Sequence, residues 1–181
     1  MKVAVIYHSK YGTTKRYAEW IAEALDASLF ERRAIQADGL QDYDLVIYGG
    51  GLYAGGISGV KLVTQNSCKN LIVFTVGLAS PEGTDYSKIL AMNLPAEMLQ
   101  HTKVFHLRGG IDYRRLGLVH KVMMFMMKTM IKRKAAKNPA GGMSQEDKEF
   151  LSTYGKQVDF TDLENIVPLV KYVRYELFES E

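Results

Sequence analysis

The sequence has little of what would indicate a secreted or membrane-spanning protein. Its 181 residues include one cysteine, Cys68, which excludes a disulfide within the chain and is typical of a reducing compartment. No apolar run reaches the roughly 18 residues that a membrane-spanning helix needs. Met1 and Lys2 lead directly into a strand pattern rather than into a signal peptide. We therefore expect a single globular domain over residues 1–181, located in the cytoplasm.

Acidic residues are nearly absent from one part of the chain. Between Arg108 and Lys137 there are nine Lys or Arg residues and one acid, Asp112, although the whole chain carries a net charge of only +3. The rest of the chain is therefore mildly acidic. A basic segment on an acidic body predicts a surface that meets an anionic partner.

The sequence also lacks the patterns of common hydrolytic and metal-dependent sites. None of the four histidines has the spacing of a metal ligand set, and neither a Ser-His-Asp arrangement nor a catalytic carboxylate pair is evident. We therefore predict no metal site and no catalytic side chain, so any chemistry would have to come from a bound cofactor.

What the chain does contain is a series of buried strands, each followed by a loop rich in glycine or hydroxyl groups. Continuous apolar runs predict strands at residues 3–7, 44–49, 71–76 and 103–108, with a weaker strand at 29–35. Helical patterns alternate with them, at 13–27 and at 85–99, where Pro95 bends or divides the helix. This alternation predicts an α/β fold with a doubly wound parallel sheet of five strands. Ligands of such folds bind beyond the carboxyl ends of the strands.

The alternation stops after the fifth strand. Residues 113–134 and 144–158 read as two helices, and a capping-box pattern at Thr161 begins a last helix. Pro168 lies inside that last pattern, so the helix is kinked or begins later than the cap suggests. We expect a basic helical insertion at about 111–159, before the last helix.

The turn after the first strand is rich in hydroxyl groups. It reads Ser9-Lys10-Tyr11-Gly12-Thr13-Thr14, and a helix pattern follows at once. A strand, such a turn and a helix N-terminus together favour binding of an anion. The turn lacks both the Gly-Lys-Ser/Thr of a nucleotide P-loop and the three glycines of a dinucleotide loop. It fits a phosphate monoester, the alternative being an ordinary polar turn with a threonine cap.

This stretch resembles the FMN phosphate loop of flavodoxins, Ser/Thr-x-Thr-Gly-x-Thr. Tyr11 replaces the middle threonine, a departure that still leaves a hydroxyl in reach. The resemblance covers residues 1–110 in element order and implies the flavodoxin sheet order 2-1-3-4-5. Residues 109–116 and the basic, methionine-rich helix after them resemble a narrower branch, the menaquinone-dependent protoporphyrinogen oxidases.

The resemblance implies that FMN is bound without a covalent link, by three loops. The phosphate loop supplies Ser9, Lys10, Tyr11, Gly12, Thr13 and Thr14. The second loop approaches the flavin ring closely through glycine, with Tyr53 as the best stacking residue. The third loop offers backbone groups to the pyrimidine edge of the ring. The residues of these two loops are Gly50, Gly51, Leu52, Tyr53, Ala54 and Gly55 in the second, and Thr75, Val76, Gly77 and Leu78 in the third.

The resemblance to the oxidase branch implies a flavin-dependent oxidoreductase, in which electrons pass from a large apolar reduced substrate to a quinone. Two alternatives stay open, because the fold alone does not define a function. One is a soluble electron carrier that meets redox proteins, although classical flavodoxins are acidic. The other is a binding module that has lost FMN.

The basic helical segment predicts a second contact. The pattern of apolar and basic residues predicts an amphipathic helix. Its basic residues Arg114, Lys121, Lys128 and Lys132 suit the anionic inner face of a membrane, and its apolar side could instead cover a hydrophobic ligand. The alternative is a helix packed on its own domain with a solvated lysine edge. No stacking aromatics lie among the basic residues, so nucleic acid is not expected.

Overall fold

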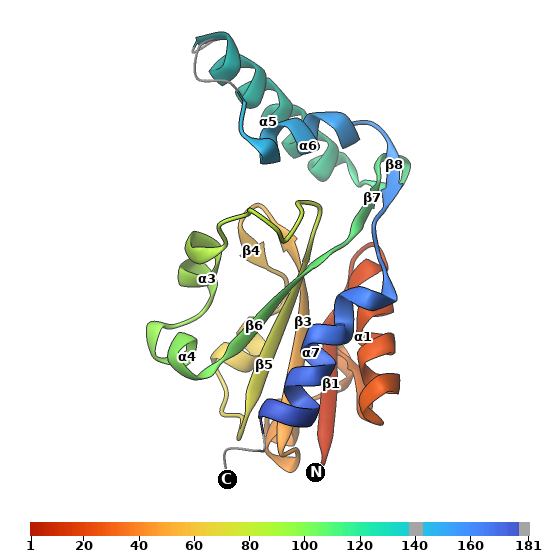
Figure 1. Cartoon of the computed structure of the whole chain (residues 1–181), viewed down its shortest axis with the longest axis vertical. Helices are drawn as coiled ribbons and strands as arrows, with labels where there is room; N and C mark the ends of the chain where they lie inside the picture. The colour runs from red at the N-terminus through yellow and green to blue at the C-terminus, as the bar shows by residue number, and fades with distance from the viewer. Residues whose placement is uncertain (138–142, 178–181) are drawn as a thin grey trace.

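The structure is a computed structural model that describes residues 1–137 and 143–177. A parallel sheet forms its centre (Figure 1), with β2 (Ser28–Glu31), β1 (Val3–His8), β3 (Leu45–Tyr53), β5 (Leu71–Gly77) and β6 (Lys103–Arg108) side by side in that order. The two-residue β4 (Gly56–Ile57) pairs antiparallel with the end of β3 and was not expected. Counted without β4, the parallel strands run 2-1-3-4-5.

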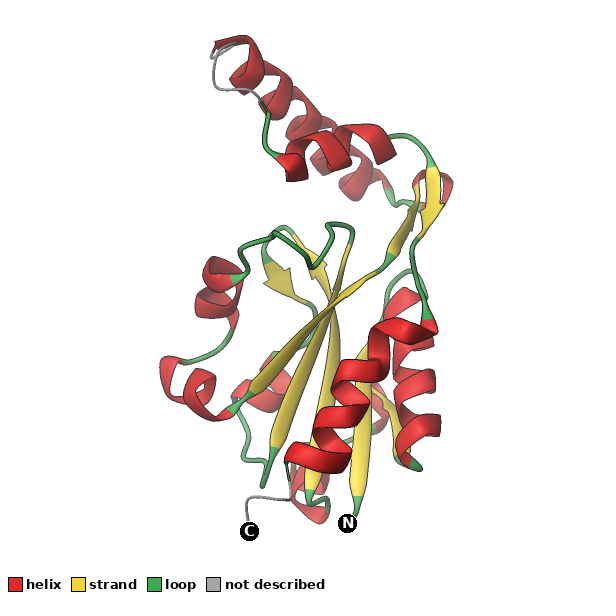
Figure 2. Ribbon diagram, viewed as in Figure 1, coloured by secondary structure: helices red, strands yellow, loops and turns green. Residues whose placement is uncertain are grey.

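Both faces of the sheet are buried, which explains the continuous apolar runs. Val5 and Ile47 point to one face, where α1 (Thr13–Leu25) and α7 (Val167–Lys171) cover them. Alternate residues such as Val46 point to the other face. There they meet α2 (Lys61–Thr64) and the region of α3 (Ser87–Asn93) and α4 (Ala96–His101). Figure 2 shows the resulting three layers.

Several element boundaries differ from the sequence prediction. The strand expected at 29–35 ends at Glu31 and continues as a 3₁₀ turn, Arg32–Ala34, at the exposed edge of the sheet. The helix expected at 85–99 is divided at Pro95 into α3 and α4 rather than bent there. The last helix begins late: Asp162 caps a 3₁₀ turn, Leu163–Ile166, and Pro168 occupies the first turn of α7. A π-helical turn, Tyr172–Glu176, follows α7.

The segment after β6 leaves the sheet on a short ribbon. β7 (Gly110–Asp112) pairs antiparallel with β8 (Gln157–Asp159), and between them lie a 3₁₀ turn (Tyr113–Arg115), α5 (Leu118–Lys137) and α6 (Gln145–Thr153). The helix expected at 144–158 ends at Thr153 because the chain turns at Gly155, whose φ is 80°, into β8. Figure 1 shows α5 and α6 beyond the carboxyl ends of the strands. No helix of the described ranges is long and apolar enough to cross a membrane.

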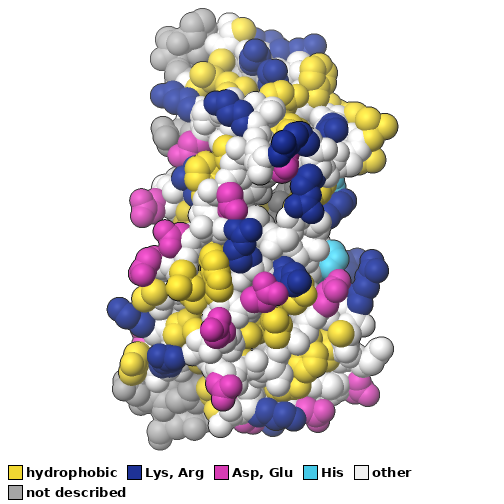
Figure 3. Space-filling model, turned by 90° about the vertical axis from the view of Figure 1, so that its right-hand side faces the viewer, with side chains coloured by type: hydrophobic (Ala, Val, Ile, Leu, Met, Phe, Trp, Pro, Cys, Tyr) yellow, Lys and Arg dark blue, Asp and Glu magenta, His cyan; other side chains and the backbone are white. Residues whose placement is uncertain are grey.

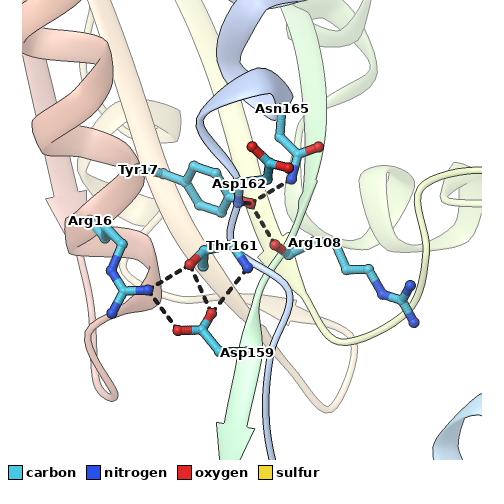
Figure 4. Close-up of polar contacts among 7 residues, drawn as sticks. All are labelled: Arg16, Tyr17, Arg108, Asp159, Thr161, Asp162 and Asn165. Atoms are coloured by element: carbon cyan, nitrogen blue, oxygen red, sulfur yellow. Dashed lines mark hydrogen bonds and ion pairs between the residues drawn. The ribbon is translucent and has the colours of Figure 1, made fainter.

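Side chains of α1 hold both ends of this insertion (Figure 4). The buried Tyr17 hydroxyl donates a hydrogen bond to the Arg108 carbonyl, at 2.6 Å, where the chain leaves the sheet. The same oxygen accepts bonds from the Asp162 amide and from Nδ2 of Asn165, where the chain returns. Arg16 donates to Asp159 at 2.6 Å. The position of the insertion therefore depends on one turn of α1.

Tyr17→Phe should lower the free energy of unfolding by about 1–3 kcal/mol, because the Arg108 carbonyl, the Asp162 amide and the Asn165 side chain lose their hydrogen-bond partner while the ring is kept. Urea unfolding followed by circular dichroism measures the change. The matched control is Tyr175→Phe, since Tyr175 is exposed, and it should stay within about 0.5 kcal/mol of the wild type. Equal effects of the two substitutions would contradict the anchoring role of Tyr17.

Candidate functional site

An apolar cavity of about 400 Å³ lies between the carboxyl ends of the sheet strands and α5. Its volume is within the range of pockets that bind cofactors and drug-sized ligands, about 300–1,000 Å³. All three predicted loops contribute to it. The lining residues from these loops are Tyr11, Thr13, Thr14, Gly51, Leu52, Tyr53, Ala54, Val76, Gly77 and Leu78. The structure thus brings together ten of the sixteen predicted cofactor residues.

The other six predicted residues do not line the cavity. Thr75 is fully buried and its hydroxyl is hydrogen-bonded to His106 at 2.6 Å, on the opposite side of the strand from Val76. Gly50 faces Ile57, and a Cβ atom at Gly50 would lie 2.6 Å from Cγ2 of Ile57. The remaining four are Ser9, Lys10, Gly12 and Gly55. The alternation of strand residues explains why Thr75 and Gly50 do not line the cavity, because successive residues of β5 and β3 point to opposite faces of the sheet.

The N-terminus of α1 provides the features of an anion site. Gly12 adopts φ 97° just before the helix, and its amide donates to Oγ of Ser9 at 3.1 Å. The first helical bond runs from Arg16 N to Gly12 O, so the amides of the first turn have no helical acceptor. No acidic residue lies in that turn. A phosphate there would meet backbone amides, hydroxyls and the positive end of the helix dipole, which fits the phosphate of FMN.

The Tyr11 side chain is bound to α5, although its position in the motif suggests that its hydroxyl would lie near the phosphate. Its hydroxyl is hydrogen-bonded to Nδ1 of His120 on α5, at 2.7 Å. The rings of Tyr11, Tyr53 and His120 form one cluster, with centroids 5.6–6.2 Å apart. The tyrosine hydroxyl, expected within reach of the phosphate, therefore joins the phosphate loop to the insertion instead. His120 was not predicted as a site residue, because nothing in its local pattern indicates a neighbour 109 positions away.

The second loop is a tight hairpin held against α3. Ala54 and Gly55 both have positive φ, as the central residues of a type I′ turn do. Asn93 accepts from the Ile57 amide at 2.8 Å and donates to the Gly55 carbonyl at 2.7 Å. Burial raises the pKa of Tyr53 to about 12, so its phenol is neutral at physiological pH. The hairpin therefore presents a fixed, uncharged aromatic ring to the cavity.

Glycines let the loops approach one another. A Cβ at Gly77 would lie 3.2 Å from Cδ1 of Leu52, across the gap between the second and third loops. A Cβ at Gly109 would lie 2.6 Å from Cγ1 of Val76. Glycine at these positions therefore lets the loops pack closely at the strand ends, where a larger residue would push them apart.

The far wall of the cavity is made by the insertion. Its lining includes Leu116, Phe150 and five methionines of α5, which are Met123, Met124, Met126, Met127 and Met130. Flexible thioether side chains adapt to apolar molecules of irregular shape. The helix is not the amphipathic one expected from the sequence, because other apolar residues, including Leu118 and Phe125, are exposed on its outer side.

A second link joins the insertion to the third loop. The Arg108 guanidinium donates to the Leu78 carbonyl and to the Glu149 carboxylate of α6, both at 3.2 Å. Glu149 also accepts from the Ser80 amide at 3.4 Å. The third loop and α6 are thus bound to the same side chain, which fixes the height of the insertion above the sheet.

Comparison with known proteins establishes the class. The sequence matches the flavodoxin domain family over residues 4–140, so this chain belongs to that family. The family match supports FMN as the cofactor, and the loops described above fit it. No curated protein matches the chain. No group of three or more metal-ligating side chains is present in the part of the chain that the structure describes.

The chain is also similar to solved flavodoxins and flavoproteins. A flavodoxin from the domain Archaea is 16% identical, over 60% of this chain and 83% of that one, with a TM-score of 0.42. A WrbA-like flavodoxin from Agrobacterium tumefaciens is 22% identical, over 58% and 82%, with a TM-score of 0.41. A flavoprotein from Lactobacillus acidophilus NCFM, solved in complex with FMN, is 17% identical, over 59% and 91%, with a TM-score of 0.39.

His106, on β6 beside the third loop, gives the fold a measurable pH dependence. Its ring is stacked on Tyr86 at 3.6 Å, and burial lowers its pKa to about 4 from the usual 6.5. In the unfolded chain the imidazole protonates near pH 6.5, whereas in the folded chain it resists protonation until about pH 4. The stability it contributes is complete above pH 6.5 and is lost as the pH falls toward 4.

His106→Gln should therefore reduce the loss of unfolding free energy between pH 7 and pH 4.5, because glutamine has no proton to gain. Urea unfolding at both pH values measures this loss. His101→Gln, an exposed histidine on α4, serves as the control and should behave like the wild type. An unchanged loss in His106→Gln would show that other groups cause the acid sensitivity.

Proposed function

We propose that this protein is an FMN-dependent oxidoreductase that oxidises a large apolar substrate, of the protoporphyrinogen kind, and passes the electrons to a quinone. The observation that carries the proposal is the cavity, in which the three flavodoxin loops form one wall and methionines of α5 form the other. Bound FMN would supply the chemistry, since flavin exchanges electrons in pairs with organic substrates. The side chains bind and orient the reactants and exclude water.

Each group of residues has a distinct task in this proposal. Ser9, Thr13 and Thr14 hold the phosphate together with the first amides of α1. Leu52 and Tyr53 pack against the flavin ring, while the backbone near Gly77 meets its edge. Leu116 and the five cavity-lining methionines of α5 enclose the apolar substrate. Enclosure replaces water by apolar side chains, which favours a substrate with little polar surface.

The insertion favours an enzyme over a soluble electron carrier. A carrier must bring an exposed flavin edge against a partner protein, whereas here α5 lies over the loops that would hold the ring. The basic insertion also differs from the acidic surface by which classical flavodoxins dock. A binding module without FMN is a third reading, and it is excluded if the protein retains FMN.

The outer side of α5 suits an anionic membrane surface, which we propose as the place where the quinone is met. Figure 3 shows hydrophobic and basic side chains together on the insertion, at the top of the view. Six basic residues and no acid lie on the helix. Arg114 is bound to Asp112, and Lys128 lies 4.1 Å from the Tyr154 ring. Of the four basic residues expected to meet lipid, Lys121 and Lys132 therefore form no ion pair or ring contact with the described residues.

The phosphate loop can be tested with two flavins. The apoprotein should bind FMN at least about tenfold more tightly than riboflavin, because riboflavin has no phosphate to bind the amides and hydroxyls of the loop. Thr13→Val should weaken binding of FMN and leave that of riboflavin unchanged. Quenching of flavin fluorescence measures both affinities. Equal affinities for the two flavins, or no binding of either, would contradict the assigned loop.

The reaction and the membrane contact can be tested together. The FMN-loaded protein should oxidise protoporphyrinogen with soluble menadione or with menaquinone in phosphatidylglycerol vesicles. Lys121→Glu with Lys132→Glu should lower only the vesicle rate, because lipid anions no longer attract the helix. Lys61→Glu with Lys88→Glu, two exposed lysines outside the insertion and the phosphate loop, is the charge-matched control. Absence of turnover with either acceptor would favour the carrier, and an unchanged vesicle rate would rule out this membrane surface.

A further inference from the structure

His120 is the polar exception in the wall that α5 contributes to the cavity. Its half-buried ring lies among the methionines, with Nδ1 hydrogen-bonded to the Tyr11 hydroxyl at 2.7 Å. The Tyr53 ring lies beside it, at 5.6 Å between centroids and 36° between planes. Nε2 makes no hydrogen bond with the described residues. The hydrogen bond at Nδ1 therefore orients the imidazole ring, and Nε2 is available to bind a ligand or a proton.

The other cavity side chains cannot take up a proton near neutral pH. Besides His120, the polar side chains of the lining are the phenols of Tyr11 and Tyr53 and the hydroxyls of Thr13 and Thr14. No carboxylate, lysine or arginine of the residues that the structure describes lines the cavity. Only imidazole, among these side-chain types, exchanges protons between about pH 5 and 8. Lys10 lies 5.9 Å from the Tyr11 ring, and Lys121 is next to His120 in α5. Arg16, Asp112, Arg115 and Asp159 line a smaller cavity that Tyr11 and Thr13 also border.

We propose that Nε2 of His120 accepts the proton that the substrate loses, an inference that rests on the proposed function. Bound FMN would supply the oxidant, accepting a hydride when a substrate C–H bond breaks. An adjacent N–H or O–H bond also breaks, and its electron pair forms the new double bond of the product. The proton left over passes to His120, and the imidazolium releases it when the quinone takes two electrons and two protons. His120 is thus a catalytic base in an otherwise apolar site.

Tyr11 is the positioning residue in this arrangement. For Nε2 to accept a proton, the neutral imidazole must carry its own proton on Nδ1, and that N–H then donates to the tyrosine oxygen. A hydrogen-bonded partner at one ring nitrogen is the usual way in which proteins fix the tautomer of a catalytic histidine. This contact explains why tyrosine replaces the middle threonine of the phosphate motif, because a threonine at position 11 would be too short to reach His120 on α5.

The tautomer tests the proposal without turnover. In the FMN-loaded protein labelled with ¹⁵N-histidine, NMR at pH 7.5 should show His120 protonated on Nδ1 and bare on Nε2. The signal is assigned from its loss in His120→Asn or, if that variant does not fold, in His120→Gln. Tyr11→Phe should give a mixture of tautomers. A wild-type His120 protonated on Nε2 would overturn the proposal.

The kinetic test uses the reduction of the flavin by protoporphyrinogen without oxygen, followed by stopped-flow absorbance. His120→Asn should slow the reduction at least about 100-fold and abolish its decline at low pH, because the group that must be unprotonated is gone. His101→Asn should match the wild type. Equal rates and pH profiles in both variants would overturn the role of His120 and leave the proposed function intact. Failure of the wild type to bind FMN would instead contradict the proposed function.

Discussion

The register of the parallel strands is the constraint on which the rest of the structure depends. β1 pairs with β3, and β3 pairs with β5, in one continuous register without a bulge. Tyr7 therefore lies beside Gly49, and Gly51 lies beside Val76. All their carboxyl ends consequently reach the same edge of the sheet, and the loops that follow them meet there. Burial of both faces makes this register strict. A slip of one strand by one residue would exchange its side chains that pack against α1 and α7 with those that pack against α2, α3 and α4.

Much of this core could be predicted from the sequence, because its signals are local. Apolar runs identified the parallel strands, the glycine and hydroxyl content identified the three loops, and Pro95 identified the break between two helices. Two of the predicted cofactor residues face away from the cavity. Gly50 and Thr75 lie at the carboxyl ends of their strands but point to the other face of the sheet, since only alternate residues share a face.

The insertion was less predictable because distant contacts determine it. The ribbon of β7 and β8 joins residues 45 positions or more apart through three-residue strands too short to leave a pattern. Its anchors on Tyr17 and Arg108 join different elements of the fold. The methionines of α5 indicated an apolar surface that could meet a membrane or cover a ligand, but not the position of that surface over the strand ends. Tyr11 was recognised as a departure from the motif, but only the folded chain reveals its partner, His120.

The composition of α5 is unusual for a helix at the surface. A helix that is apolar nearly all round is normally buried on all sides. In α5 only Ile131 is buried, and Val119, Phe125 and Met130 are among seven apolar residues that are 45–79% exposed. Such a helix is stable in water only at a cost, since each exposed apolar side chain forgoes the free energy of burial. That cost is removed if molecules from outside the chain cover both sides. An apolar substrate in the cavity would cover the inner side, and lipid would cover the outer side, so both proposals account for the same feature.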